Sequence, residues 1–155
     1  MTDARSDDAE VRVARMIDAP RERVYEAWTT PSLLRQWWGP GGFTCPEAEV
    51  DLQPGGRYRL VMQPPGGERM IVTGIYHEIV APSLLVYTWQ WEAGPEDPGH
   101  ESLVTVEFRD HGERTEVIVS HGQFPAAHDL SPYRTGWEEG LGKLDLHASG
   151  RAAHA

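Results

Sequence analysis

The fold of this chain is decided by the stretch Ser131-Pro-Tyr-Arg-Thr-Gly-Trp-Glu-Glu-Gly-Leu-Gly-Lys-Leu-Asp-Leu-His147. At about 100° per residue, its large apolar residues fall on one narrow stripe, which predicts a long amphipathic helix over residues 131–147. The stripe consists of Leu130, Tyr133, Trp137, Leu141, Leu144 and Ala148. Ser131 is expected to be the N-cap and Pro132 the first helical residue. The stripe needs a partner surface on which to be buried.

The same helix contains three glycines, Gly136, Gly140 and Gly142. Each costs about 1 kcal/mol relative to alanine in a helix interior, so packing has to supply most of the stability. Gly136 and Gly140 lie four residues apart on one shoulder of the stripe, where a backbone or a ligand can approach closely. Close packing of the helix on a sheet is the favoured interpretation, and a role in ligand binding is the alternative.

The partner surface is predicted to be an antiparallel sheet. Alternating apolar residues indicate seven strands, over residues 11–17, 48–52, 56–63, 68–80, 84–91, 102–110 and 115–121. From residue 48 onward the links are short and rich in Gly and Pro, which leaves no room for a crossover helix and requires antiparallel neighbours. Two short helices are expected over residues 21–28 and 32–38. The predicted class is therefore α+β, with a sheet covering a C-terminal helix.

Length and composition favour one domain, over residues 10–148, with a disordered leader (1–9) and a disordered tail (149–155). The formal net charge of −10 opposes phosphate backbones, so nucleic-acid binding is not expected. Cys45 is the only cysteine, which excludes an intrachain disulfide and favours a reducing compartment. The sequence shows no secretory signal and no apolar run of about 18 residues. We therefore expect a cytoplasmic protein without membrane insertion.

A series of short motifs follows a characteristic order between about residues 10 and 147. They are Ala19-Pro20, Val24-Tyr25, Trp28, Thr30-Pro31, Leu33-Leu34, Trp37-Trp38-Gly39-Pro40, Asp51, Gly55-Gly56-Arg57-Tyr58, Thr73-Gly74, Tyr76, Pro82, Leu85, Thr88-Trp89, Gly136-Trp137, Leu141 and Leu144. This set resembles the activator-of-heat-shock-protein-ATPase (AHSA-like) branch of the START-like SRPBCC superfamily. The resemblance implies a helix-grip fold, in which a seven-stranded antiparallel sheet wraps a long C-terminal helix and leaves a hydrophobic cavity. It also implies relatives of several kinds. Some bind lipids, sterols or polyketides, and others are polyketide cyclases, subunits of ring-hydroxylating enzymes or a eukaryotic co-chaperone.

An aromatic ladder, Tyr87, Trp89 and Trp91, alternates along one face of its predicted strand. If this face looks at Tyr133 and Trp137, the rings form the walls of a pocket suited to a flat or apolar ligand. Leu141 completes this set of candidate ligand-binding residues. The alternation does not say which face is inside, and rings that simply fill the core are an equal alternative.

The seven histidines do not indicate a metal site, because no two lie four residues apart on a helix and none has a cysteine partner. His77 and His121 lie within strands and are the weak candidates for a catalytic base, although a buried, hydrogen-bonded histidine is the usual explanation. No nucleophile elbow, phosphate loop or dinucleotide motif occurs, so no cofactor is expected.

Three functions follow from these patterns. The first is binding of a small apolar or aromatic molecule between sheet and helix. The second is a cyclase, dehydratase or hydrolase type of enzyme that uses a cavity histidine. The third is an interaction module, either chaperone-associated or a homodimer, with Trp37 and Trp38 as its exposed contact residues.

Overall fold

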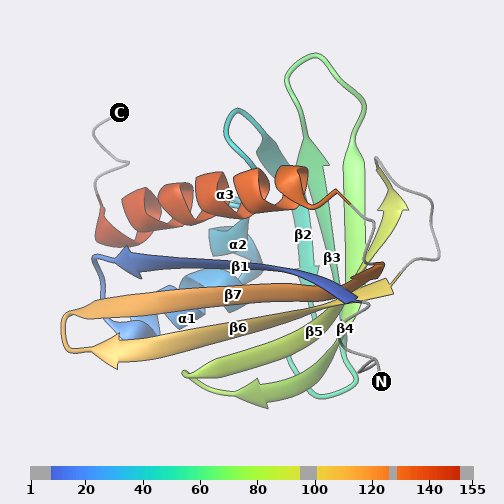
Figure 1. Cartoon of the computed structure of the whole chain (residues 1–155). Helices are drawn as coiled ribbons and strands as arrows, with labels where there is room; N and C mark the ends of the chain where they lie inside the picture. The colour runs from blue at the N-terminus through green and yellow to red at the C-terminus, as the bar shows by residue number, and fades with distance from the viewer. Residues whose placement is uncertain (1–7, 95–100, 126–128, 151–155) are drawn as a thin grey trace, which may run out of the picture.

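The computed structural model describes residues 8–94, 101–125 and 129–150 (Figure 1). The predicted leader and tail, and the turn expected between residues 94 and 99, lie almost wholly outside the described residues. The elements follow the order β1 (Asp8–Ile17), α1 (Arg21–Thr29), α2 (Pro31–Leu34), β2 (Thr44–Val50), β3 (Arg57–Gln63), β4 (Met70–Val80), β5 (Leu84–Ala93), β6 (Glu101–His111), β7 (Arg114–Pro125) and α3 (Ser131–Ser149).

The seven strands form a single antiparallel sheet in the order β1-β7-β6-β5-β4-β3-β2. The first strand of the chain therefore pairs with the last one, and the remaining strands follow one another as hairpins. The sheet is strongly curled: β1, β7 and β6 run nearly at right angles to β2, β3 and β4, and α3 lies along β1 (Figure 1). The predicted helix-grip arrangement is confirmed.

Several strands extend beyond their predicted bounds, most of all β2 at its start and β7 at its end. β2 begins at Thr44, although Pro46 lies within it, because β2 is an edge strand in which a missing N–H is tolerated. β7 continues to Pro125 through Gly122 and Gln123, which has a positive φ of 66°. Proline and glycine usually mark the end of a strand, which explains why the sequence pattern began β2 too late and ended β7 too early.

The helix α3 buries most of the predicted stripe, including Trp137, Leu141 and Leu144. Its N-terminus differs from the prediction. Ser131 is the first helical residue and not the N-cap, and its N–H donates to Oδ1 of Asp129 at 3.0 Å. Pro132 consequently occupies the second helical position, where its missing N–H also leaves no donor unpaired.

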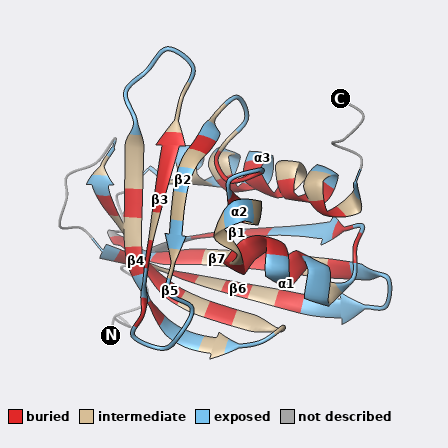
Figure 2. Ribbon diagram, turned by 180° about the vertical axis from the view of Figure 1, so that it is seen from behind, coloured by how far each residue is buried: buried red, intermediate tan, exposed pale blue. Residues whose placement is uncertain are grey.

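The second short helix is shorter than predicted, since α2 ends at Leu34 and the chain continues through turns to Trp38. These turns direct Trp37 and Trp38 into the core, where they are only 2% and 4% exposed. Both indoles pack edge-on against Trp28, with ring centroids 5.0 and 6.1 Å away. The expectation that Trp37 and Trp38 are exposed contact residues is therefore wrong. Figure 2 shows α1 and α2 covering the inner face of the sheet with their buried sides.

One buried carboxylate joins the start of the chain to its last helix. Asp145 of α3 is only 5% exposed. Its Oδ1 accepts the N–H of Asp18 at 3.0 Å, and its Oδ2 accepts Nη2 of Arg15 at 3.2 Å. Because Arg15 belongs to β1 and Asp18 follows it directly, these contacts fix α3 against the corner between β1 and α1.

Candidate functional site

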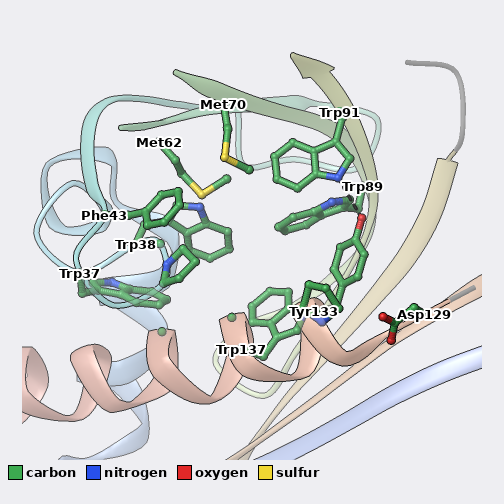
Figure 3. Close-up of a pocket in the computed structure, with 15 residues that line it drawn as sticks. Trp37, Trp38, Phe43, Met62, Met70, Trp89, Trp91, Asp129, Tyr133 and Trp137 are labelled. Atoms are coloured by element: carbon green, nitrogen blue, oxygen red, sulfur yellow. Dashed lines mark hydrogen bonds between the residues drawn. The ribbon is translucent and has the colours of Figure 1, made fainter. Parts of the chain in front are cut away.

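A cavity of about 660 Å³ lies between the first half of α3, the α2–β2 loop and the inner face of β3, β4 and β5 (Figure 3). Its walls are mainly aromatic and sulfur-containing side chains. The lining residues are Trp37, Trp38, Gly39, Pro40, Phe43, Met62, Met70, Trp89, Trp91, Asp129, Pro132, Tyr133, Gly136, Trp137 and Gly140. Asp129 is the only charged side chain among these described residues, and it is exposed.

Regularly spaced aromatic side chains of β5 and α3 form the wall of the cavity where sheet and helix meet. Trp89 and Trp91 are two residues apart on β5 and share its inner face, whereas Tyr133 and Trp137 are one turn apart on α3. The ring of Trp89 lies 5.6 Å from that of Trp137 and 5.5 Å from that of Trp91. The indole N–H of Trp91 donates to the hydroxyl of Tyr133 at 2.9 Å. Strand and helix thus meet through one continuous aromatic surface.

The opposite wall is the α2–β2 loop, which α3 holds in place. Lys143, the only lysine of the chain, donates from Nζ to the carbonyl oxygens of Pro40 at 3.0 Å and Phe43 at 2.9 Å. Glu139 accepts the N–H of Gly41 at 3.0 Å. Partial burial of the Lys143 ammonium lowers its pKa. The loop is therefore tied to α3 at both of its halves.

The glycines of α3 face this loop. A Cβ placed on Gly136 would lie 3.7 Å from the ring of Pro40, and one placed on Gly140 would lie 3.8 Å from the carbonyl oxygen of Gly39. Both glycines also line the cavity. Their lack of side chains leaves space between α3 and the loop. The favoured interpretation expected these glycines to allow close packing on the sheet, but they face the loop and the cavity instead.

The two candidate histidines occupy opposite environments. His77 is exposed on β4 and does not line the cavity. His121 is fully buried on β7, behind the rings of Trp89 and Trp137. The indole N–H of Trp137 donates to Nδ1 of His121 at 3.1 Å, and Nε2 lies 2.8 Å from Oγ of Ser102.

These contacts define the tautomer of His121. Because Nδ1 accepts a hydrogen bond, the proton of the neutral ring resides on Nε2, which donates to Ser102. The hydroxyl of Ser102 in turn donates to the carbonyl oxygen of Trp89 at 3.3 Å. The network connects Trp137 to β5, and neither histidine is among the lining residues.

Four of the six predicted ligand-binding residues line the cavity, namely Trp89, Trp91, Tyr133 and Trp137. Tyr87 and Leu141 do not. Leu141 is fully buried in the core. Tyr87 packs with Tyr58 and Tyr76 in a cluster of tyrosines outside the cavity lining, at ring-centroid distances of 5.1 and 5.8 Å. Burial raises the pKa of the Tyr87 hydroxyl far above its usual value.

Sequence reasoning missed several lining residues, including Trp38, Phe43, Met62, Met70 and Asp129. Met62 and Met70 face each other across the β3–β4 hairpin. The predicted turn between these strands could have revealed this pair, since residues at equal distances from a hairpin turn are partners.

The cavity offers few polar groups to a guest. Among the described residues, the indole N–H groups of Trp38 and Trp89 have no hydrogen-bond partner, and both nitrogens are buried. Among the described lining residues, the other polar side-chain groups are the carboxylate of Asp129, the hydroxyl of Tyr133 and indole N–H groups that donate to protein acceptors. Such a lining fits an apolar body better than a polar one.

Other chemistry finds little support in the part of the chain that the structure describes. No group of three or more His, Cys, Asp or Glu residues there is placed to hold a metal ion. None of the helices described is long and apolar enough to cross a membrane. Burial raises the pKa of Cys45 to about 11, against smaller opposite effects of Arg35 and Lys143, so its thiol stays protonated at neutral pH.

Comparison with known proteins gives a consistent result. Residues 18–148 match the model of the family described as Activator of Hsp90 ATPase homolog 1-like protein. No curated protein matches the chain.

Similar folds occur in several solved structures. A protein from Chromobacterium violaceum is 25% identical with a TM-score of 0.80, covering 90% of this chain and 96% of its own. A protein from Rhizobium leguminosarum is 26% identical with a TM-score of 0.75, covering 92% and 95%. The AHSA1 protein from Silicibacter pomeroyi is 25% identical with a TM-score of 0.73, covering 95% and 100%.

Proposed function

The chain belongs to the Activator of Hsp90 ATPase homolog 1-like family, and we propose that it binds a small apolar or aromatic molecule in the cavity between α3 and the sheet. The observation that carries this proposal is the cavity itself. Its volume of about 660 Å³ lies within the range of about 300–1,000 Å³ that is typical of small-molecule sites. Its walls are almost entirely apolar, and Gly136 and Gly140 leave the space open where α3 faces the loop.

A catalytic role receives less support from the geometry. The buried histidine, His121, has protein partners on both ring nitrogens and lies behind the cavity wall. His77 is exposed elsewhere on β4. A base has to lie within hydrogen-bond reach of a substrate proton, and neither residue meets this condition for a guest in the cavity. Binding without turnover is therefore the function that we favour.

The proposal is tested by a thermal-shift screen of small aromatic and aliphatic compounds, combined with native mass spectrometry. A ligand that binds only the folded protein stabilises it by about 2.7 kcal/mol when the free ligand is at one hundred times its Kd. The Tm of the protein therefore rises with ligand concentration. We expect stabilising compounds with one bound molecule per chain.

A cavity-blocking variant supplies the control. Gly136→Leu places an apolar side chain in the cavity and should abolish the shift produced by these compounds. Gly142→Leu makes the same change on the same helix at a position that does not line the cavity, and should retain it. Shifts that survive Gly136→Leu, or a screen without any stabilising compound, would contradict the proposal.

A further inference from the structure

The cavity wall differs in composition from the core of the protein. The fifteen lining residues include five tryptophans, one phenylalanine, one tyrosine and two methionines. Among the described residues, no Leu, Ile, Val or Ala lines the cavity, although these types supply much of the buried core. The described wall therefore offers a guest mainly the edges and faces of aromatic rings and the sulfur atoms of thioethers.

The two methionines form the side of the cavity that belongs to β3 and β4. Met62 and Met70 lie directly opposite each other in the antiparallel ladder, so their side chains emerge next to each other on the inner face of the sheet. Figure 3 shows both entering the cavity from the sheet, on the side opposite Trp137. A Cβ placed on Gly39 would lie 3.8 Å from Sδ of Met62, so this sulfur also reaches the α2–β2 loop.

Three indoles on the other sides of the cavity are inclined to one another. The rings of Trp38 and Trp137 meet at 85° with centroids 5.7 Å apart, and those of Trp89 and Trp137 meet at 55° and 5.6 Å. Trp38 and Trp89 are tilted by 41° at 6.2 Å. Aromatic rings attract one another in edge-to-face and offset arrangements, because their faces carry partial negative charge and their edges partial positive charge. A further ring can extend this arrangement, whereas a saturated ring has no such charge distribution.

The thioethers favour an aromatic guest for a related reason. A methionine sulfur is polarisable and makes favourable contacts with aromatic rings, often at the ring edge. Each contact of this kind, like each contact between two rings, strengthens binding by roughly two- to tenfold over what the buried area alone supplies. A saturated ring of the same shape buries a similar area and gains neither kind of contact.

From this geometry we propose that the cavity selects guests with an aromatic ring over saturated guests of the same shape. The ring lies between the thioethers of Met62 and Met70 and the indoles of Trp89 and Trp137. The two methionines determine this specificity, and their flexible side chains adapt to rings of different outline. The inference rests on the proposed binding function and specifies the chemical class of its ligand.

The test compares two probes that differ only in their ring, phenylbutanol and cyclohexylbutanol, each with the ring and the hydroxyl at opposite ends of the chain. Their Kd values are measured by isothermal titration calorimetry. Each Kd is compared with the partition of the same probe between water and hexadecane, because a saturated ring leaves water more readily than an aromatic one. On this scale we expect the phenyl probe to bind about tenfold more favourably.

Substitutions of single methionines locate the origin of the preference. Met62→Leu and Met70→Leu nearly conserve apolar volume, which cores tolerate well, and remove the sulfur. Each should weaken binding of the phenyl probe about two- to tenfold and leave the cyclohexyl probe unchanged. Met16→Leu is the matched control, since Met16 is exposed on β1 and does not line the cavity. It should change neither affinity, and the Tm of each variant reports that it is folded.

The outcomes separate this inference from the proposed function. Equal or tighter binding of the cyclohexyl probe on the hexadecane scale would overturn the aromatic preference and leave apolar binding intact. The same holds if Met62→Leu and Met70→Leu weaken both probes equally, or affect the phenyl probe no more than Met16→Leu does. Absence of binding by both probes would overturn the preference and the proposed function together.

Discussion

His121 determines how the wall of the cavity is held. It takes the N–H of Trp137 on Nδ1 and passes a hydrogen bond through Ser102 to the backbone of Trp89. While each polar group of this network is paired, its burial carries no penalty for a missing hydrogen bond. A network that leaves some buried groups unpaired is less stable than an apolar core at the same place. The residue therefore acts on the site through Trp137, which it orients.

Replacing His121 by phenylalanine tests this role. His121→Phe keeps a ring of similar shape but leaves the Trp137 N–H without its acceptor and Ser102 without its donor. Each buried group left unpaired costs about 1–3 kcal/mol, so the free energy of unfolding should fall by roughly 2–6 kcal/mol in a denaturant titration. His77→Phe, at an exposed position, should change it by about 0.5 kcal/mol or less. Equal losses in both variants would contradict the assigned network.

The contrast between these histidines shows where residue-level prediction ends. Both lie within strands whose residues alternate, and the sequence treats them alike. What separates them is which face of the curled sheet each side chain takes, together with the local register. Register shifts adjoin both histidines: the β4–β5 ladder shifts between Tyr76 and Glu78, and the β1–β7 ladder shifts between Ala9 and Val11, the partner of His121. Such a bulge has no clear signature in the pattern of apolar residues.

At the scale of elements, the α2–β2 loop is the part of the cavity that depends on a few polar contacts. It contains no regular structure, and two of its glycines, Gly39 and Gly42, adopt left-handed conformations with φ of 106° and 82°. Lys143 and Glu139 of α3 supply the bonds that hold it. The shape of the cavity is therefore coupled to the position of α3.

Lys143→Met removes the ammonium and keeps most of the aliphatic stem. We expect a loss of about 1–3 kcal/mol in the free energy of unfolding, because two backbone carbonyls lose a charged donor, and faster amide hydrogen exchange around Gly41 and Phe43. Arg23→Met is the control, since Arg23 also donates to a carbonyl oxygen of α3, that of Ala148 at 3.2 Å, away from the cavity. Unchanged exchange in the loop of Lys143→Met would refute the tether.

The elements themselves were largely predictable, and their ends were not. A period of 3.6 over residues 131–147 and a period of two before it are strong signals, because burial of one face imposes them. The start of α3 depends instead on which of two neighbouring side chains, Asp129 or Ser131, reaches the first free N–H. The burial of Trp37 and Trp38 depends on turns that follow α2, and neither periodicity nor composition encodes the direction of such turns.

At the scale of the whole molecule, the first strand lies against the last strand and the last helix of the described chain. β1 pairs with β7 along nearly its whole length, and Asp145 fixes α3 to the residues that end β1. Family and layout were predictable from ordered motifs that span the chain. The cavity lining was predictable only in part, since it depends on how far the sheet curls around α3, and no local pattern sets that curvature.

Asp145→Leu tests the junction between α3 and the end of β1. The substitution leaves the partly buried Asp18 N–H without its acceptor and also removes the ion pair with Arg15, so the free energy of unfolding should fall by about 1–3 kcal/mol, with faster hydrogen exchange along α3. Arg15→Met removes only the partly exposed half of the ion pair, which is worth about 0–1 kcal/mol. A larger loss in Arg15→Met than in Asp145→Leu would show that the ion pair, and not the backbone contact, secures the helix.

The pairing of β1 with β7 also bears on how the protein is made. A ribosome releases the chain from its N-terminus, yet the partner of β1 is the last strand to be synthesised, and the carboxylate that secures the corner after β1 emerges about twenty residues later still. During synthesis β1 therefore remains without its partner strand until β7 has emerged. Closure of this sheet is for that reason a late step of folding, because it requires β7, and the corner after β1 is secured only when α3 is also present.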